Sequence, residues 1–102
     1  MSYYGTTIND FQASSTHSVP WNGSTGMFAV SASSFNGTTV TLKHKIGNFF
    51  VDLGTDAVLS TNGAVIFSTS ATELQVSVSA GSGNPSSGAV ILVQPVAENK
   101  AF

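Results

Sequence analysis

The chain contains no cysteine and no arginine, and charged side chains make up only 8% of its 102 residues. Without cysteine it can form no disulfide and no thiolate metal site, so its stability must come from a packed core. Three lysines are the only side-chain cations, and the formal net charge is -2. Nucleic-acid binding needs a basic stripe, which this composition does not supply. We therefore expect no nucleic-acid partner.

Long apolar runs are missing as well. The longest is residues 89–93, far short of the roughly 20 residues that a membrane helix needs. The first ten residues are polar and lack the apolar stretch of a signal peptide. No segment keeps apolar residues at helical spacing for three turns. We expect no membrane contact, no signal peptide and no long helix.

Apolar and polar residues instead alternate with period two in several short segments, as in half-buried β-strands. Such segments lie within residues 27–32, 39–46, 49–53, 64–67 and 74–79, with weaker ones at 16–19 and 57–59. The run 89–93 is apolar at every position, which predicts a strand buried on both faces. Asn-Gly pairs at Asn22, Asn36 and Asn62, and the pair Gly47-Asn48, mark tight turns between the segments.

Short strands at regular spacing predict an all-β fold, an antiparallel β-sandwich of jelly-roll or Ig-like type with roughly seven to eight short strands. The sandwich should span residues 16–96, after an N-terminal arm at 1–15 and before a C-terminal tail at 97–102. The Gly/Ser-rich residues 80–88 predict a mobile hairpin loop. The expected core draws one or more residues from most segments: Phe28, Val30, Val40, Leu42, Leu53, Phe67, Leu74, Val76, Val78 and Ile91.

The N-terminal arm is expected because its apolar side chains show no period that would place them in the sandwich. Such side chains gain nothing in water, so we expect them to dock on a neighbouring subunit or on another protein. The rival interpretation is an extra edge strand folded onto the chain's own sandwich. Together with the single tryptophan, these residues are the expected interface: Tyr3, Tyr4, Ile8, Phe11 and Trp21.

Residue patterns for catalysis or metal binding are lacking. His17 and His44 are the only histidines, and no serine lies in a nucleophile motif. His44 shares a strand face with Leu42, where a half-buried, hydrogen-bonded histidine is the commoner case. Asp52 and Asp56 are close in sequence, but two carboxylates are few for Ca²⁺. We expect no enzyme activity, no cofactor and no metal, and hence no catalytic, cofactor-binding or metal-binding residues.

Three stretches resemble a known group of proteins. A Trp/Gly-rich turn and a Phe-x-Val strand span residues 20–30, a Gly-x-Thr-Val-x-Leu strand ends at Leu42, and an aromatic-Val-Asp-hydrophobic-Gly segment spans 50–54. This pattern resembles that of small virion proteins of tailed bacteriophages, over roughly residues 18–80. The chain departs from the pattern at Leu74, where an aromatic is replaced, and in a longer Gly/Ser loop.

The resemblance implies a head decoration or cement protein, a head-fibre base or a tail-associated module, and it carries over no site residues. We expect a non-catalytic virion protein that binds the outer capsid and reinforces it. Its partners would be phage capsid or other virion proteins and further copies of itself, with a trimer favoured. The alternative is a receptor- or glycan-binding module of a tail or fibre. Such a module should expose an aromatic platform beside polar side chains in a concave site.

Overall fold

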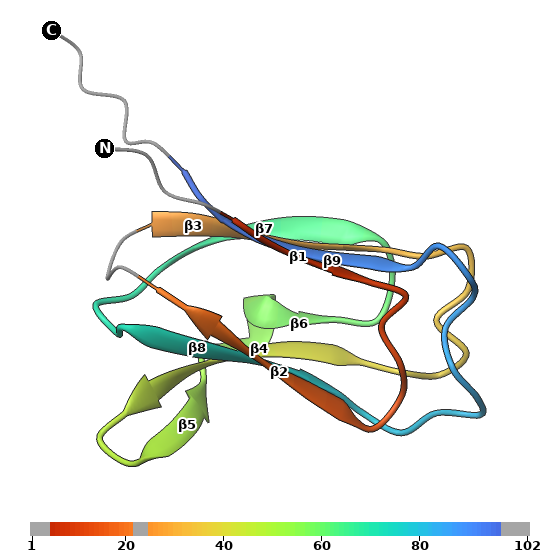
Figure 1. Cartoon of the computed structure of the whole chain (residues 1–102), viewed down its shortest axis with the longest axis horizontal. Helices are drawn as coiled ribbons and strands as arrows, with labels where there is room; N and C mark the ends of the chain where they lie inside the picture. The colour runs from red at the N-terminus through yellow and green to blue at the C-terminus, as the bar shows by residue number, and fades with distance from the viewer. Residues whose placement is uncertain (1–4, 22–24, 97–102) are drawn as a thin grey trace, which may run out of the picture.

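The computed structural model describes residues 5–21 and 25–96, which form two β-sheets packed face to face (Figure 1). The expected all-β sandwich is confirmed, and the described residues contain no α-helix. In chain order the elements are β1 (Thr6–Asn9), β2 (Ser15–Pro20), β3 (Thr25–Ser31), β4 (Val40–Ile46), β5 (Phe49–Asp52), the 3₁₀ turn η1 (Thr55–Ala57), β6 (Val58–Leu59), β7 (Gly63–Ser68), β8 (Glu73–Val78) and β9 (Val90–Pro95).

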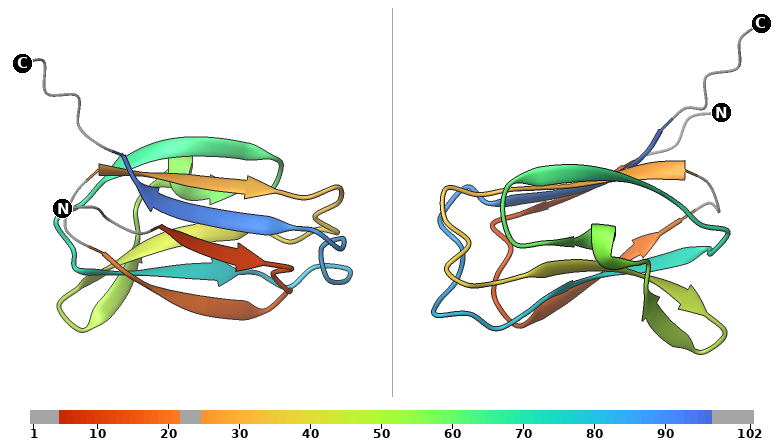
Figure 2. Two further views of the ribbon diagram at one scale, coloured as in Figure 1. Left: turned by 45° about the horizontal axis from the view of Figure 1, so that its top comes forward. Right: turned by 180° about the vertical axis from the view of Figure 1, so that it is seen from behind.

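The strand pairs of the two sheets are nested along the chain. Sheet A has the order β1-β9-β3-β7 and sheet B the order β2-β8-β4-β5, with β6 also paired to β4. The first strand thus pairs with the last, β2 with β8, β3 with β7, and β4 with β5, all antiparallel. This nesting is a long hairpin wrapped into two sheets, the jelly-roll connectivity. Of the two sandwich types expected, the jelly roll is therefore the one observed (Figure 2).

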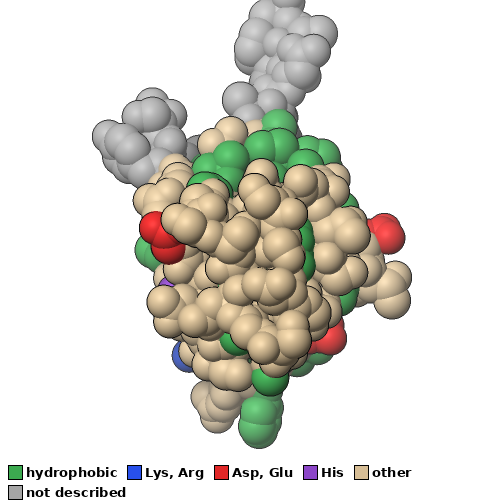
Figure 3. Space-filling model, turned by 90° about the vertical axis from the view of Figure 1, so that its right-hand side faces the viewer, with side chains coloured by type: hydrophobic (Ala, Val, Ile, Leu, Met, Phe, Trp, Pro, Cys, Tyr) green, Lys and Arg blue, Asp and Glu red, His purple; other side chains and the backbone are tan. Residues whose placement is uncertain are grey.

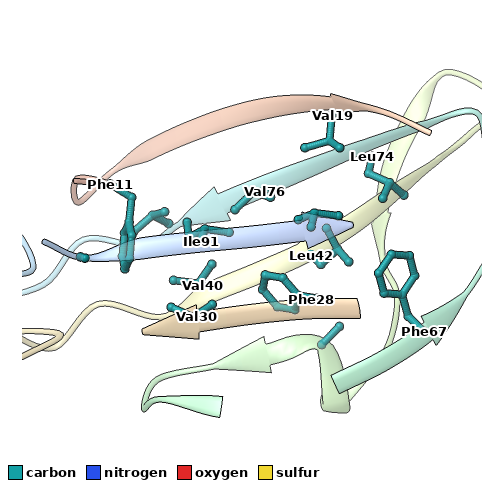
Figure 4. Packing of buried hydrophobic residues seen from close by; sticks show 14 of the residues in the cluster. Phe11, Val19, Phe28, Val30, Val40, Leu42, Phe67, Leu74, Val76 and Ile91 are labelled. Atoms are coloured by element: carbon teal, nitrogen blue, oxygen red, sulfur yellow. The ribbon is translucent and has the colours of Figure 1, made fainter. Parts of the chain in front are cut away.

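The inner faces of the two sheets form one core (Figure 4). Phe28 and Val30 of β3 face Leu42 of β4 and Val76 of β8 across it. Every expected core residue is buried except Leu53, which is partly buried and packs against the cluster. Alternation predicted these positions well because each strand turns one side to the opposite sheet.

The arm expected at residues 1–15 is wrong for its described part, where the rival interpretation holds. β1 pairs with β9 along its whole length, and Ser15 begins β2. Phe11, between them, is 2% exposed, and its ring meets that of Phe35 edge-on at 6.2 Å. Burial of such a side chain contributes about 1.5–3 kcal/mol, which holds this crossover in the core. Residues 1–4, with Tyr3 and Tyr4, and the tail at 97–102 lie outside the described residues.

The continuous apolar run of β9 predicted burial on both faces, but the structure buries only one of them. Ile91 and Val93 point into the core and are fully buried. Val90 and Leu92 point outward from sheet A and are only partly buried. The chain covers one face of this strand and leaves an apolar second face.

The Gly/Ser-rich segment at 80–88 is not a hairpin loop, because it crosses from β8 in sheet B to β9 in sheet A. It is held against the Asn36-Gly37 turn: Ser82 N donates to Asn36 O at 2.8 Å, and Asn36 Nδ2 donates to Asn84 O at 2.6 Å. The turn has positive φ at both central residues, 50° and 82°, as type I′ turns require.

Candidate binding surface

The side chains that the sequence assigned to an interface are mostly in the interior. Phe11 and Trp21 belong to the core, and Ile8 of β1 packs against it. The Trp21 ring lies 5.1 Å from that of Phe67, over Gly26, where a Cβ atom would collide with it. These three residues therefore do not form the expected docking surface.

Large exposed apolar side chains gather instead on the β4–β5 hairpin. Ile46 is 55% exposed, Phe49 74% and Val51 44%. Ile46 is paired with Phe49, and Val51 with His44, so the three apolar side chains lie on one face of the hairpin. We call Ile46, Phe49 and Val51 the hairpin patch. The expected tight turn joins the strands, with Gly47 at a φ of 63° as the first turn residue.

The hairpin patch continues the inner face of sheet B past the region that sheet A covers. Along β4, burial falls from the fully buried Val40 and Leu42 to the half-buried His44 and then to the exposed Ile46. β5 extends away from sheet A in both views of Figure 2. These side chains lie on the same face of sheet B as the buried Leu42, but no strand of sheet A lies over them.

The opposite face of the hairpin is charged. Lys43 Nζ lies 4.0 Å from Asp52 Oδ1, and Lys45 Nζ lies 3.7 Å from Glu73 Oε1. Lys45 Nζ also lies 6.0 Å from the centre of the Phe50 ring. Exposed ion pairs of this kind add at most about 1 kcal/mol each. The hairpin is amphipathic, because its charged side chains lie on one face and the hairpin patch lies on the other.

A hollow of about 580 Å³ lies between the end of this hairpin and the β7–β8 connection. Its lining combines Ile46 of the hairpin patch with polar side chains that include His44, Thr72 and Glu73. His44 Nδ1 lies 2.7 Å from Thr69 Oγ1, which also accepts a hydrogen bond from Ala71 N at 3.1 Å. His44 is thus the half-buried, hydrogen-bonded histidine that the sequence predicted, and it ties the hairpin to the β7–β8 connection.

The other polar groups form local contacts. Ser15 Oγ donates to Gln12 O at 2.6 Å and lies 3.4 Å from His17 Nε2, so its proton is directed to the backbone and not to the histidine. Within residues 5–21 and 25–96, no three His, Asp or Glu side chains are close enough together to hold a metal ion. The same residues contain no helix long and apolar enough to cross a membrane.

The hairpin patch could have been found only in part from the sequence. Phe49 and Phe50 are adjacent on a strand, so alternation places one of them on each face. Which face lacks a cover depends on how far the other sheet extends, and no local pattern encodes that.

Comparison of the chain with protein-family models found no match, and comparisons with curated proteins and with solved structures found none either.

Proposed function

We propose that the protein is a non-catalytic structural component of a bacteriophage virion, a capsid decoration protein that binds the outer capsid and reinforces it. The observation that carries this proposal is the hairpin patch. An exposed phenylalanine with aliphatic neighbours suits a binding surface, because aromatic residues are enriched and charged residues depleted in the buried centre of protein interfaces. The capsid surface would cover Phe49, Ile46 and Val51.

The strength of one such contact follows from the exposed fractions. Full burial of a large apolar side chain contributes about 1.5–3 kcal/mol. Scaled by the exposures of the hairpin patch, 74%, 55% and 44%, burial would contribute roughly 2.5–5 kcal/mol. Association costs at least about 4 kcal/mol in lost motional freedom, so a single copy would bind weakly. Several linked copies on a regular capsid would bind far more tightly, because linkage raises the effective concentration.

Two further features support the proposal. Jelly rolls recur in viral capsid proteins, a likeness at the level of fold alone. The surface also carries few charges and many short hydroxyl and amide side chains. Such side chains lose little conformational entropy when a partner covers them, which suits a chain that works packed against other proteins.

The alternative, a receptor- or glycan-binding module, is favoured by the hollow beside the hairpin patch. Phe49 is paired with Ile46, which lines the hollow next to His44, Thr72 and Glu73. An exposed aromatic ring beside a concave polar lining is the arrangement that stacks on a sugar. In this case the hydroxyl and carboxylate groups of the hollow, and not the apolar face alone, would determine affinity.

Binding of the purified protein to capsids of the encoding phage, prepared without it, tests the proposal. We expect the Phe49→Ser variant to lose at least about tenfold in affinity, because it removes the largest exposed anchor. The Val58→Ser variant is the matched control, since Val58 is an exposed aliphatic residue of β6 outside the hairpin patch.

The outcomes separate the two functions. Absence of capsid binding by the unaltered protein, or equal binding by the Phe49→Ser and Val58→Ser variants, contradicts the decoration proposal. Retention on a glycan array that falls for both Phe49→Ser and Glu73→Gln, without any capsid binding, identifies the glycan-binding alternative instead.

A further inference from the structure

The outer face of sheet A is apolar at its centre and uncharged. Among the described residues, none that points outward from this sheet is charged, whereas the outer face of sheet B carries Lys43, Lys45, Asp52 and Glu73. Figure 3 shows hydrophobic side chains gathered along the top of the molecule, over sheet A. The two faces of the sandwich therefore offer very different surfaces to their surroundings.

Strand register places these apolar side chains in adjoining rows. Leu92, Ala29 and Ala64 form one row across β9, β3 and β7. Met27 and Ile66 belong to the next row, and Val90 lies on the other side of the first. The rim of the face is polar, with Thr7, Asn9, Ser68 and Gln94 around this centre. An apolar centre with a polar rim is the anatomy of a protein interface.

In a strand with one face in water, the residues on that face are normally polar and alternate with apolar residues on the core face. β9 does not, because Val90 and Leu92 point outward from a strand whose Ile91 and Val93 fill the core. The sequence of β9 is that of a strand covered on both faces, and the described chain covers one. A second protein layer would complete its burial.

The shape of the face indicates what that layer is. An open hollow of about 330 Å³ is lined by the small residues Ala29, Ser31 and Gly63 and by Val90 and Leu92. Ile66 projects from the same face and is 63% exposed. In a two-fold pair each contact occurs twice, so a projection and a hollow on one face can fit each other reciprocally.

We propose that the outer face of sheet A binds a second copy of this chain, as a two-fold dimer in which Ile66 of each copy enters the hollow beside Ala29 and Gly63 of the other. The absence of charge allows two identical faces to meet without repulsion. A partner with a charged surface would instead leave its charges unpaired against aliphatic groups.

The size of the face sets the strength of the dimer. The four strands of sheet A lie about 4.8 Å apart and are roughly six residues long, which gives a flat face of about 400 Å². Stable complexes bury about 800 Å² per partner, so this dimer should be weak and concentration-dependent. It would form where copies are crowded, as on a particle, and it would be largely dissociated in dilute solution.

Sedimentation analysis of the purified full chain over a wide concentration range tests this, and it involves no capsid, so its outcome is independent of the proposed function. We expect the weight-average mass to rise from monomer to dimer with concentration. Ile66→Lys should remain monomeric, because each interface would then bury two uncompensated charges. Val58→Lys, the same change on the outer face of sheet B, should dimerise as the unaltered chain does.

A chain that stays monomeric at millimolar concentration, that forms trimers, or that responds equally to both lysine substitutions contradicts the proposal. Cross-linking adds a positional test, since the chain has no cysteine of its own. A mixture of Ile66→Cys and Ala29→Cys chains, oxidised with glutathione disulfide, should give mixed dimers well above the share that random pairing of the two chains would produce. A yield of mixed dimers equal to the random share would rule out the reciprocal geometry.

Discussion

Replacement of Phe11 by alanine should destabilise the protein strongly, although Phe11 lies in a connection and not in a strand. The side chain is 2% exposed, and its ring packs edge-on against Phe35 between the two sheets. Truncation of a buried phenylalanine costs about 3–5 kcal/mol, because the transfer energy is lost and a cavity remains. A domain of this size has a total stability of about 5–15 kcal/mol, so the loss is a large fraction of it.

The matched control is Phe49→Ala, the same chemical change at the most exposed of the large apolar side chains in the described residues. Its unfolding free energy should change by no more than about 0.5 kcal/mol. The comparison removes the effect of the residue type and leaves only the difference in burial. It also separates the stability of the fold from the binding function proposed for the hairpin patch.

Urea unfolding followed by tryptophan fluorescence measures both variants, since the only tryptophan, Trp21, lies in the core. With a urea dependence of about 1–3 kcal/mol per M, Phe11→Ala should lower the midpoint by at least about 1 M. A midpoint within experimental error of that of Phe49→Ala would show that Phe11 is not buried. The arm interpretation of residues 1–15 would then be restored.

Two further substitutions test local contacts. Gly81→Ala should cost at least about 1 kcal/mol in the same assay, because its Cβ would collide with the backbone oxygen of Asn36; Gly83→Ala, which meets nothing within 4 Å, should be neutral, and equal midpoints would contradict the described loop contact. Thr69→Val should cost about 1 kcal/mol through loss of the hydrogen bond to His44; an unchanged unfolding free energy would show that this bond does not hold the hairpin.

Strand positions were predictable where each strand has one buried side. In β8, Leu74, Val76 and Val78 alternate with polar residues, and all three are buried. β1 escaped prediction because its four residues include a single apolar side chain, Ile8. Its place in the fold comes from pairing with β9, more than eighty positions along the chain. Pairing over that separation leaves no local signature in the sequence.

The candidate surfaces were less predictable, because exposure depends on where the opposite layer ends. Trp21 was expected at an interface as a large aromatic beside a turn, yet the absence of a side chain at Gly26 lets it pack inside. Phe49 follows the core alternation and is nevertheless exposed, since no strand of sheet A covers the hairpin. Both outcomes depend on contacts between elements and not on the local pattern.

The proposed function implies that a phage encodes this chain, and the copy number of the chain in purified virions of that phage tests it most directly. Quantitative mass spectrometry against the major capsid protein gives that number without assuming any mode of binding. A capsid decoration protein should be present in a fixed ratio to the capsid subunits or to the vertices or faces of the lattice. Absence of the chain from intact virions, or a few copies that remain with isolated tails, would contradict the account.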